Sequence, residues 1–255
     1  MTTTEQPRVD SERVGDVLVM RMNRPAKKNA VDAGMTAALD AALNELDDDP
    51  SLRCGVLTGT AEIFSAGTDL ASGPGDPTER GGMYGITARR RNTPLIAAVE
   101  GYALGGGFEI ALACDLIVAG RSARFGLPEV THGLVANCGA LFRAPRVLPL
   151  NVARQLLLTG VAIDADRALT HGLVNEVVDD GTAEHAALAL AAVIAANGPV
   201  AVRSTLEAIE ALTASTDADG WVVTKQAAAT VAASADFEEG IAAFLGRRAP
   251  KWSGR

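Results

Sequence analysis

The feature that most constrains this chain is a run of three glycines that leads directly into an apolar, helix-forming stretch. The glycines occupy 105–107, follow an expected strand, and precede Phe-Glu-Ile-Ala-Leu-Ala-Cys. Glycine lets the backbone turn sharply and lets a ligand approach the main-chain amides. The first N–H groups of a helix lack intrahelical partners and carry the positive end of the helix dipole. This turn therefore predicts a site that holds an oxyanion.

One carboxylate lies inside the apolar stretch. Glu109 is surrounded by Phe, Ile, Ala, Leu and Cys, so its side chain is either buried for a chemical reason or turned towards a cleft. The alternative is a glutamate that only stabilises the helix N-terminus, a favourable effect of ~0.3–1 kcal/mol. The residues around Glu109 leave both interpretations open.

Two further segments carry groups of the same kind. Residues 64–70, Phe-Ser-Ala-Gly-Thr-Asp-Leu, form a second glycine-bearing turn after an expected strand. Residues 125–130, Phe-Gly-Leu-Pro-Glu-Val, place Glu129 directly after a proline that fixes the backbone. Taken singly, the first is explained by an ordinary strand-to-helix turn and the second by a surface-loop glutamate.

Length and composition describe a globular protein with a substantial core. The 255 residues fit one large domain, or a domain with a helical appendage. Hydrophobic residues make up 48% and aromatic residues only 4%, so the core must be built from Ala, Val, Leu and Ile. We therefore expect a compact α/β or α-rich protein.

The charge balance disfavours nucleic acid as a partner. The net charge is −8, and the only dense basic cluster, Arg89-Arg90-Arg91, is typical of a solvated face. No apolar run approaches the ~20 residues of a membrane span, and the polar segment Met1–Asp10 lacks the apolar core of a signal peptide. We expect a cytoplasmic protein with no membrane association.

Cysteine and histidine give no sign of a metal centre or cofactor. The three cysteines, Cys54, Cys114 and Cys138, are widely spaced and fit buried free thiols in a reducing compartment. The three histidines lack metal-ligand spacing and are expected to be ordinary loop or surface residues. The patterns GxSxG, GxxxxGK[ST] and GxGxxG are all missing. We therefore expect no metal and no cofactor.

Apolar periodicity and turn residues predict the order of elements. Asp32 is a good N-cap for a helix with an apolar face, and Asp236 with Glu239 resembles a capping box for a terminal helix. The Gly- and Pro-rich stretch from Asp69 to Gly85 predicts a mobile segment. Strands are expected at 16–22, 52–58, 94–99, 115–119 and 173–178, and helices at 32–46, 108–114, 164–171, 183–196, 200–212 and from 221 onwards.

In this order, the three glycine- and glutamate-bearing segments resemble the enoyl-CoA hydratase/isomerase (crotonase) superfamily. The loop 23–30, the segment 165–174 and the tail 237–250 are similar to that family as well. The resemblance implies an α/β fold in which repeated ββα units form a spiral. It implies a core with the active site at 1–195 and a C-terminal helical region at 196–255. These helices would mediate assembly into a homotrimer, commonly as a dimer of trimers.

The resemblance also implies a site. The amides of Ala66 and Gly106 would form an oxyanion hole for a thioester carbonyl, and Glu109 and Glu129 would be the catalytic acid and base. The loop 27–30 and Asp69 would lie along the coenzyme A (CoA) nucleotide, and CoA would enter as part of the substrate. The residues expected to bind the acyl-CoA are Lys28, Ala30, Ala66, Gly67, Thr68, Asp69, Leu70, Gly105 and Gly106.

The expected reaction is hydration of a 2-enoyl-CoA or the reverse dehydration. Two N–H donors stabilise the enolate-like oxygen, and losing one such donor costs about 2.7–4 kcal/mol. One carboxyl group deprotonates the water while the other protonates C2, each worth roughly 10²–10⁴-fold. We assign Glu109 to the water and Glu129 to C2, without excluding the reverse. The alternatives are isomerisation, which needs only one base, another reaction of a crotonase-type acyl-CoA enzyme, or a non-catalytic acyl-CoA-binding protein.

Overall fold

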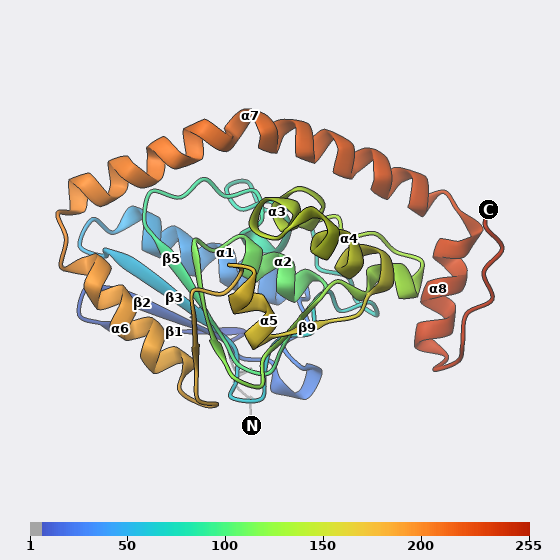
Figure 1. Cartoon of the computed structure of the whole chain (residues 1–255), viewed down its shortest axis with the longest axis horizontal. Coiled ribbons are helices and arrows are strands. Elements are labelled where there is room, and N and C mark those ends of the chain that lie inside the picture. Colours follow the sequence, from blue (N-terminus) through green and yellow to red (C-terminus); the bar gives the residue numbers. More distant parts are fainter. Residues whose placement is uncertain (1–6) are drawn as a thin grey trace, which may run out of the picture.

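The computed structural model describes residues 7–255, so the expectations for the first six residues lie outside the described part of the chain. Two sheets lie within the molecule (Figure 1). One has six strands in the order β1-β2-β3-β5-β7-β10, and the other has four in the order β4-β6-β8-β9. The strands are β1 (Val9–Val14), β2 (Val17–Met22), β3 (Cys54–Thr58), β4 (Ile63–Ser65), β5 (Leu95–Val99), β6 (Tyr102–Leu104), β7 (Leu116–Gly120), β8 (Arg124–Gly126), β9 (Ile163–Asp164) and β10 (Glu176–Val178).

The centre of the larger sheet is parallel and buried. Strands β2, β3, β5, β7 and β10 pair in parallel, and every residue of β3 and β5 is buried. Continuous apolar runs are typical of strands covered on both faces. One cover is α1 (Ala33–Asp48), whose Met35, Leu39 and Leu43 are fully buried. The helix starts as expected, because the Asp32 carboxylate accepts from the Met35 amide at 2.8 Å.

The opposite face of this sheet is covered by α6 (Ala183–Ala195). Its three buried residues, Ala183, Ala187 and Ala191, recur at intervals of four and form one stripe. Alanine lets the helix axis lie close to the sheet, where it packs on valines and isoleucines such as Val56 and Ile96. This arrangement explains how a chain with few aromatic residues fills the core between α6 and the larger sheet.

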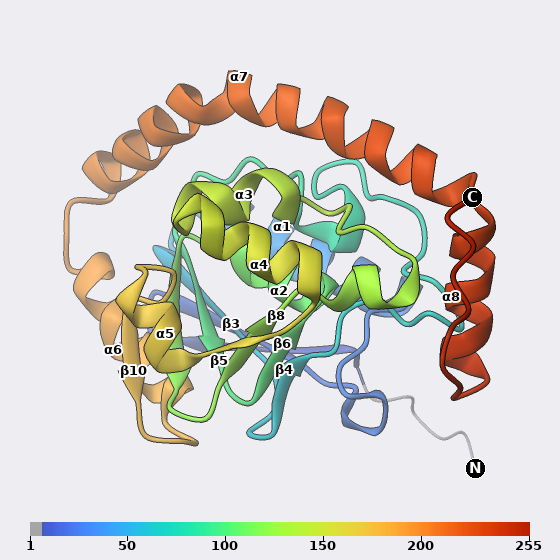
Figure 2. The same cartoon turned by 45° about the vertical axis from the view of Figure 1, so that its right-hand side comes forward.

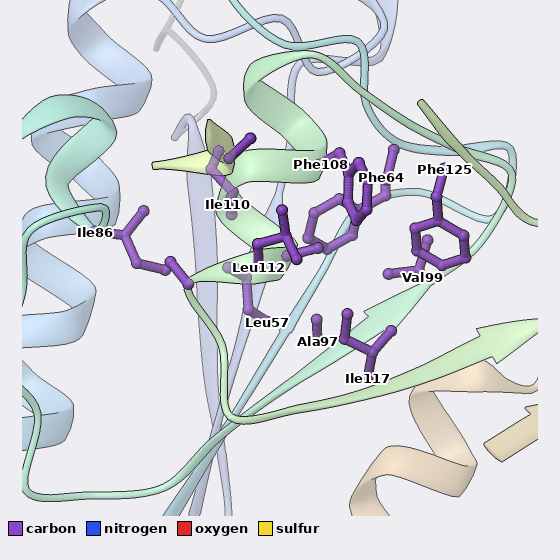
Figure 3. Packing of buried hydrophobic residues seen from close by; sticks show 14 of the residues in the cluster. Leu57, Phe64, Ile86, Ala97, Val99, Phe108, Ile110, Leu112, Ile117 and Phe125 are labelled. Atoms are coloured by element: carbon purple, nitrogen blue, oxygen red, sulfur yellow. The ribbon is translucent and has the colours of Figure 1, made fainter. Parts of the chain in front are cut away.

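The smaller sheet carries the glycine run. Strand β6 ends immediately before α2 (Gly106–Leu112), and all seven residues of α2 are buried. The Phe108 ring packs against Phe125 of β8 with ring centroids 5.5 Å apart, and Figure 3 shows both rings beside Phe64 and Ile110. The turn at the start of α2 is therefore fixed on a packed core.

Short helices and 3₁₀ turns connect the strands of the two sheets. The 3₁₀ turns are η1 (Pro25–Lys27), η2 (Met83–Gly85) and η3 (Pro128–His132), and the α-helices are α3 (Ala140–Val147), α4 (Leu150–Thr159) and α5 (Ala165–Thr170). Helix α5 is capped by Asp164, whose carboxylate accepts from the Arg167 amide at 2.9 Å.

The C-terminal region is helical but is divided differently from expectation. A single helix, α7 (Pro199–Ala232), replaces the two expected helices and arches over the core (Figures 1 and 2). Gly220 lies within this helix. A β-carbon at this position would come within 2.6 Å of the Phe142 ring, so the close packing requires glycine. Helix α6 ends at Ala195, close to the expected boundary between the two regions.

The last helix, α8 (Ala235–Leu245), packs against η3. Its N-cap is Ser234, whose hydroxyl accepts from the Phe237 amide at 3.2 Å, so the expected capping box at 236–239 is wrong. The Asp236 carboxylate instead accepts from the amides of Ser253 and Gly254 in the tail. Within residues 7–255 no single helix is long and apolar enough to cross a membrane; α6 and α7 meet that criterion only together, bent by 106°.

Candidate active site

A cavity of about 780 Å³ opens where the smaller sheet, the loop around η1 and α8 meet. Its wall includes almost all of the residues expected from the sequence. Those that line it are Lys28, Ala30, Ala66, Thr68, Asp69, Leu70, Gly105, Gly106, Glu109 and Glu129. Gly67 lies behind this wall, where a β-carbon would be 2.7 Å from the Gly106 nitrogen. The two glycine turns, distant in sequence, are therefore in contact.

Glu109 projects from α2 into the cavity and is 1% exposed. One of its oxygens, Oε1, accepts hydrogen bonds from the amides of Cys138 at 2.7 Å and Ala140 at 3.0 Å. Burial, and next the charge of Glu129, raise the pKa of Glu109 above its usual range, while these two amides pull the pKa down. The carboxylate is thus buried in the cavity wall and held by main-chain donors.

Glu129 lies in η3, and its carboxyl group sits against the start of α2. A β-carbon at Gly105 would be 3.3 Å from the Glu129 Oε1 atom. Its other oxygen, Oε2, is buried and has no hydrogen-bond partner among the described residues. Burial raises the pKa of Glu129 as well. Because the two carboxyl groups interact, they share protons as a pair.

The structure corrects the expected second oxyanion donor. The Ala66 amide donates to the Lys28 carbonyl at 3.0 Å, so it is not free to bind a substrate oxygen. The next turn residues are also engaged: the Gly67 amide donates to the Ser65 hydroxyl, and the Asp69 amide to the Val31 carbonyl. Within residues 7–255 the amide of Thr68 has no such acceptor.

Gly106 supplies the matching donor on the other turn. It is the first residue of α2, so its amide has no intrahelical acceptor, and none is found elsewhere in the described residues. Because a β-carbon on Gly67 would be only 2.7 Å from the Gly106 nitrogen, the amides of Thr68 and Gly106 lie near the junction of the two turns. The free pair is Thr68 and Gly106, not Ala66 and Gly106.

A buried asparagine fixes the loop 24–30 against this junction. The Asn29 side-chain amide donates to the carbonyls of Ile63 and Phe64, both at 3.1 Å. The Asn29 carbonyl in turn accepts from the Ser65 hydroxyl at 2.9 Å. Lys28 and Asn29 adopt the left-handed conformation, with φ of 53° and 52°. The loop that was expected to meet CoA is therefore bonded to the oxyanion turn.

Asp69 has a structural task in this arrangement. Its carboxylate receives a hydrogen bond from the Arg24 guanidinium at 2.8 Å and another from the Ala71 amide at 3.0 Å. The Arg24 contact holds the pKa of Asp69 below its usual range. Asp69 lines the cavity, but both carboxylate oxygens already have protein partners.

Several lining residues were not expected from the sequence, among them Tyr84, His132 and Arg247. Tyr84 reaches the cavity from the segment expected to be mobile, His132 lies one turn beyond Glu129, and Arg247 follows α8. The His132 ring makes an edge contact with Phe244, with centroids 5.0 Å apart. The signal for Tyr84 was an aromatic residue enclosed by glycines, Gly81-Gly82-Met83-Tyr84-Gly85.

The segment 69–85 is also more firmly attached than expected. Thr78 and Gly82 exchange two backbone hydrogen bonds of 3.0 Å. Thr36 of α1 donates to the Pro74 carbonyl at 2.6 Å, and the Thr78 hydroxyl donates to Asp40 at 2.7 Å. These bonds tie the segment to α1 and argue against a freely moving loop.

Comparison with known proteins agrees with this geometry. The family model described as enoyl-CoA hydratase/isomerase matches residues 12–255. The chain is 40% identical over 267 residues to the enoyl-CoA hydratase EchA19 of Mycobacterium tuberculosis, covering 100% of both chains. This protein belongs to the enoyl-CoA hydratase/isomerase family.

Further relatives and solved structures support the family assignment. The chain is 37% identical to the carnitinyl-CoA dehydratase of Salmonella typhi, covering 95% of this chain and 97% of the relative. It superimposes on the structure of EchA1_1 from Mycobacterium paratuberculosis with a TM-score of 0.92, 39% identity and coverage of 98% and 100%. A carnitinyl-CoA hydratase structure from Mycobacterium avium gives a TM-score of 0.92, 38% identity and the same coverage. The α/β fold expected for an enoyl-CoA hydratase/isomerase family member is confirmed.

Proposed function

We propose that this protein is an enoyl-CoA hydratase, a hydro-lyase that adds water across the C2=C3 bond of a 2-enoyl-CoA or removes it in reverse. One observation carries the proposal: two carboxyl groups, those of the buried Glu109 and the half-buried Glu129, face the same cavity. Isomerisation needs one base, whereas hydration uses both an acid and a base. The full-length relatives include proteins named as CoA hydratases and dehydratases.

The two free amides would bind the thioester oxygen. As water attacks C3, negative charge develops on that oxygen, and the N–H groups of Thr68 and Gly106 would stabilise it. In mutagenesis of comparable sites, one such donor contributes about 2.7–4 kcal/mol. Since both amides belong to turns packed on the core, they need no rearrangement when the charge forms.

The hydrogen bonds around the carboxyl groups support the division of roles. Glu109 accepts from two amides on one oxygen, which favours its ionised form and suits a base for water. Glu129 has a buried oxygen without a partner among the described residues, which suits a protonated carboxyl group that can donate to C2. Raised pKa values of both groups help the pair to retain one proton near neutral pH.

The CoA portion would enter past a basic rim. Lys27, Lys28 and Arg247 line the cavity and are exposed, although the whole chain carries a net charge of −8. A local basic edge attracts an anionic ligand even on an acidic protein. The phosphates of CoA fit this rim, and we propose no cofactor beyond the CoA of the substrate.

The proposal is tested by following the loss of the conjugated thioester absorbance of crotonyl-CoA. We expect turnover by the wild-type protein and at least a hundredfold lower kcat in Glu109→Gln and in Glu129→Gln, with binding retained. Asp166→Asn, an exposed change on α5, serves as the control. Normal turnover in either glutamine variant would remove the acid and base assignment, and binding without turnover of any acyl-CoA would favour a non-catalytic protein.

We further propose that the protein assembles as a homotrimer or a dimer of trimers through its C-terminal helices. Support comes from α7, where large apolar side chains face solvent in the single chain: Val200 is 77% exposed and Leu212 83%. Exposed apolar surface of this kind is typical of protein interfaces. A clean monomer in sedimentation equilibrium would contradict this assembly.

A further inference from the structure

Arg143, in α3, packs against the turn that holds Glu109. Its own amide donates to the Gly139 carbonyl at 3.0 Å. Gly139 has a φ of 114°, a conformation that favours glycine, and a β-carbon there would also overlap with the Arg143 Nη1 atom. The guanidinium therefore lies against the residue between Cys138 and Ala140, the two residues whose amides donate to one oxygen of Glu109.

The guanidinium of Arg143 is fixed in place, yet one of its nitrogens lacks a hydrogen bond. Nη2 donates to the Thr87 carbonyl at 2.7 Å, in the segment that follows η2. The Cζ atom lies 5.1 Å from the centroid of the Phe142 ring and 5.8 Å from that of Trp221. Nη1 is buried and has no hydrogen-bond partner among the described residues. Because a buried charged donor without a partner is costly, this placement needs a reason beyond hydrogen bonding.

The charged groups that face Arg143 come from several elements. They are Glu109 of α2, Arg91, and Glu210 and Asp217 of α7. Arg91 already forms an ion pair with Asp115 at 2.7 Å. Asp217 already forms one with Arg146 of α3. Burial lowers the pKa of Arg143, but a guanidinium keeps its proton in proteins, so a positive charge stays beside the turn that holds Glu109.

This charge favours the ionised form of Glu109. Burial and the charge of Glu129 raise the pKa of Glu109, whereas the two amides and Arg143 lower it. Tyr84 and Cys138 also lie near this carboxyl group, and burial raises the pKa of both well above their usual values. They stay neutral at the pH of catalysis and bring no opposing charge. A base for water must be ionised before it can accept a proton.

We propose that Arg143 is a positioning residue for the reaction, which holds the turn 138–140 and supplies the buried positive charge that keeps Glu109 ionised as the base for water. This inference rests on the proposed function. Arg143 is not among the described residues that line the cavity, so it acts through Glu109 rather than on the substrate. An arginine that served the fold alone would change stability but not the pH at which the base ionises.

The test is the pH profile of kcat/KM for hydration of crotonyl-CoA, since its acid limb reports ionisation of the base in the free enzyme. Arg143→Gln removes the charge but keeps an N–H donor for the Thr87 carbonyl. We expect its acid limb to move up by about one pH unit, so that the rate is about tenfold lower on that limb and recovers as pH rises. Arg143→Lys retains the charge and should keep the limb close to its wild-type position.

Arg146→Gln is the matched control. Arg146 lies on the same helix, pairs with Asp217 of α7, and places its Cζ atom 5.4 Å from the centroid of the Phe142 ring. Its side chain is 33% exposed, and it does not contact the turn 138–140 through any described hydrogen bond. Loss of this charge should leave the acid limb in place.

An unshifted limb in Arg143→Gln, or equal shifts in the glutamine and lysine variants, would overturn the proposal. Arg143→Met leaves no buried polar group and replaces the glutamine variant if that variant does not fold. Failure of both neutral variants to fold would assign Arg143 to the fold alone and would overturn the proposal as well.

Infrared difference spectra between two pH values follow the ionisation of Glu109 without turnover, with Glu109→Gln to identify the band of the protonated carboxyl group. We expect this band to persist to higher pH in Arg143→Gln than in the wild-type protein, and an unchanged titration would reject the role of Arg143. If the wild-type protein hydrates no enoyl-CoA but the band still shifts, the proposed reaction fails while the action of Arg143 on Glu109 stands.

Discussion

Helices α2 and α7 represent opposite ways of using a helix in this molecule. All seven residues of α2 are buried, whereas only Thr224 is buried among the 34 residues of α7. Helix α2 therefore finds its packing partners within its own chain. Helix α7 contacts α3 and α8 but leaves much apolar surface uncovered. The comparison teaches that the helix carrying Glu109 is fully packed within its own chain, whereas the outer helix keeps an apolar surface that we propose another copy covers.

The largest expected effect follows from truncating one apolar residue in each helix. Ile110→Ala, in fully buried α2, should lower the free energy of unfolding by about 2–5 kcal/mol through loss of packing and creation of a cavity. Leu212 is 83% exposed on α7. Leu212→Ala should therefore change the free energy of unfolding of the dissociated chain by no more than about 0.5 kcal/mol. Urea denaturation at low protein concentration measures both. Similar losses in the two variants would contradict the contrast.

The second prediction tests whether α7 contacts another copy of the chain. Leu212→Asp places a charge in the surface that we propose is shared between copies, so desolvation of that charge should weaken assembly at least tenfold. Sedimentation equilibrium over a range of concentrations measures the shift. Asp219→Asn on the same helix is the control. An unchanged association constant for Leu212→Asp would place the interface elsewhere.

The third prediction is a pH dependence that arises at α2. The folded pKa values of Glu109 and Glu129 are raised above the usual 4.5, so between these values the native state holds more protons than the unfolded chain. The free energy of unfolding should therefore fall as pH rises through that window, by at most about 1.4 kcal/mol per pH unit for each proton. Glu109→Gln should flatten this decline. Denaturation curves from pH 5 to pH 9 check it, and parallel profiles for both proteins would contradict it.

The same contrast shows what the sequence could predict. The buried strands β2, β3, β5 and β7 were found because parallel strands covered on both faces are continuous apolar runs. Strands β4, β6 and β8 have three residues each, too few to show a pattern. The sequence analysis left a break between 212 and 221, inside α7. At Gly220, within that break, the close approach of the Phe142 ring explains why glycine is kept.

At the site, the residues could be found but not their orientation. Both glutamates and both glycine turns were predicted, since each follows a local pattern. Which amide of the turn 65–69 is free depends on the bridge between Val31 and Thr68, a contact between segments distant in sequence. Tyr84 was missed for the same reason, because only the fold brings its loop to Gly106.

The hydrogen bonds to Glu109 couple the position of α7 to this carboxyl group. The donors Cys138 and Ala140 lie in the turn that begins α3, and α3 meets α7 where the Phe142 and Trp221 rings are 5.1 Å apart. A shift of α7 would thus be transmitted through one aromatic contact and one turn to the proton-accepting group. If neighbouring copies hold α7 in place, dilution should lower the specific activity of the enzyme before any loss of helical content.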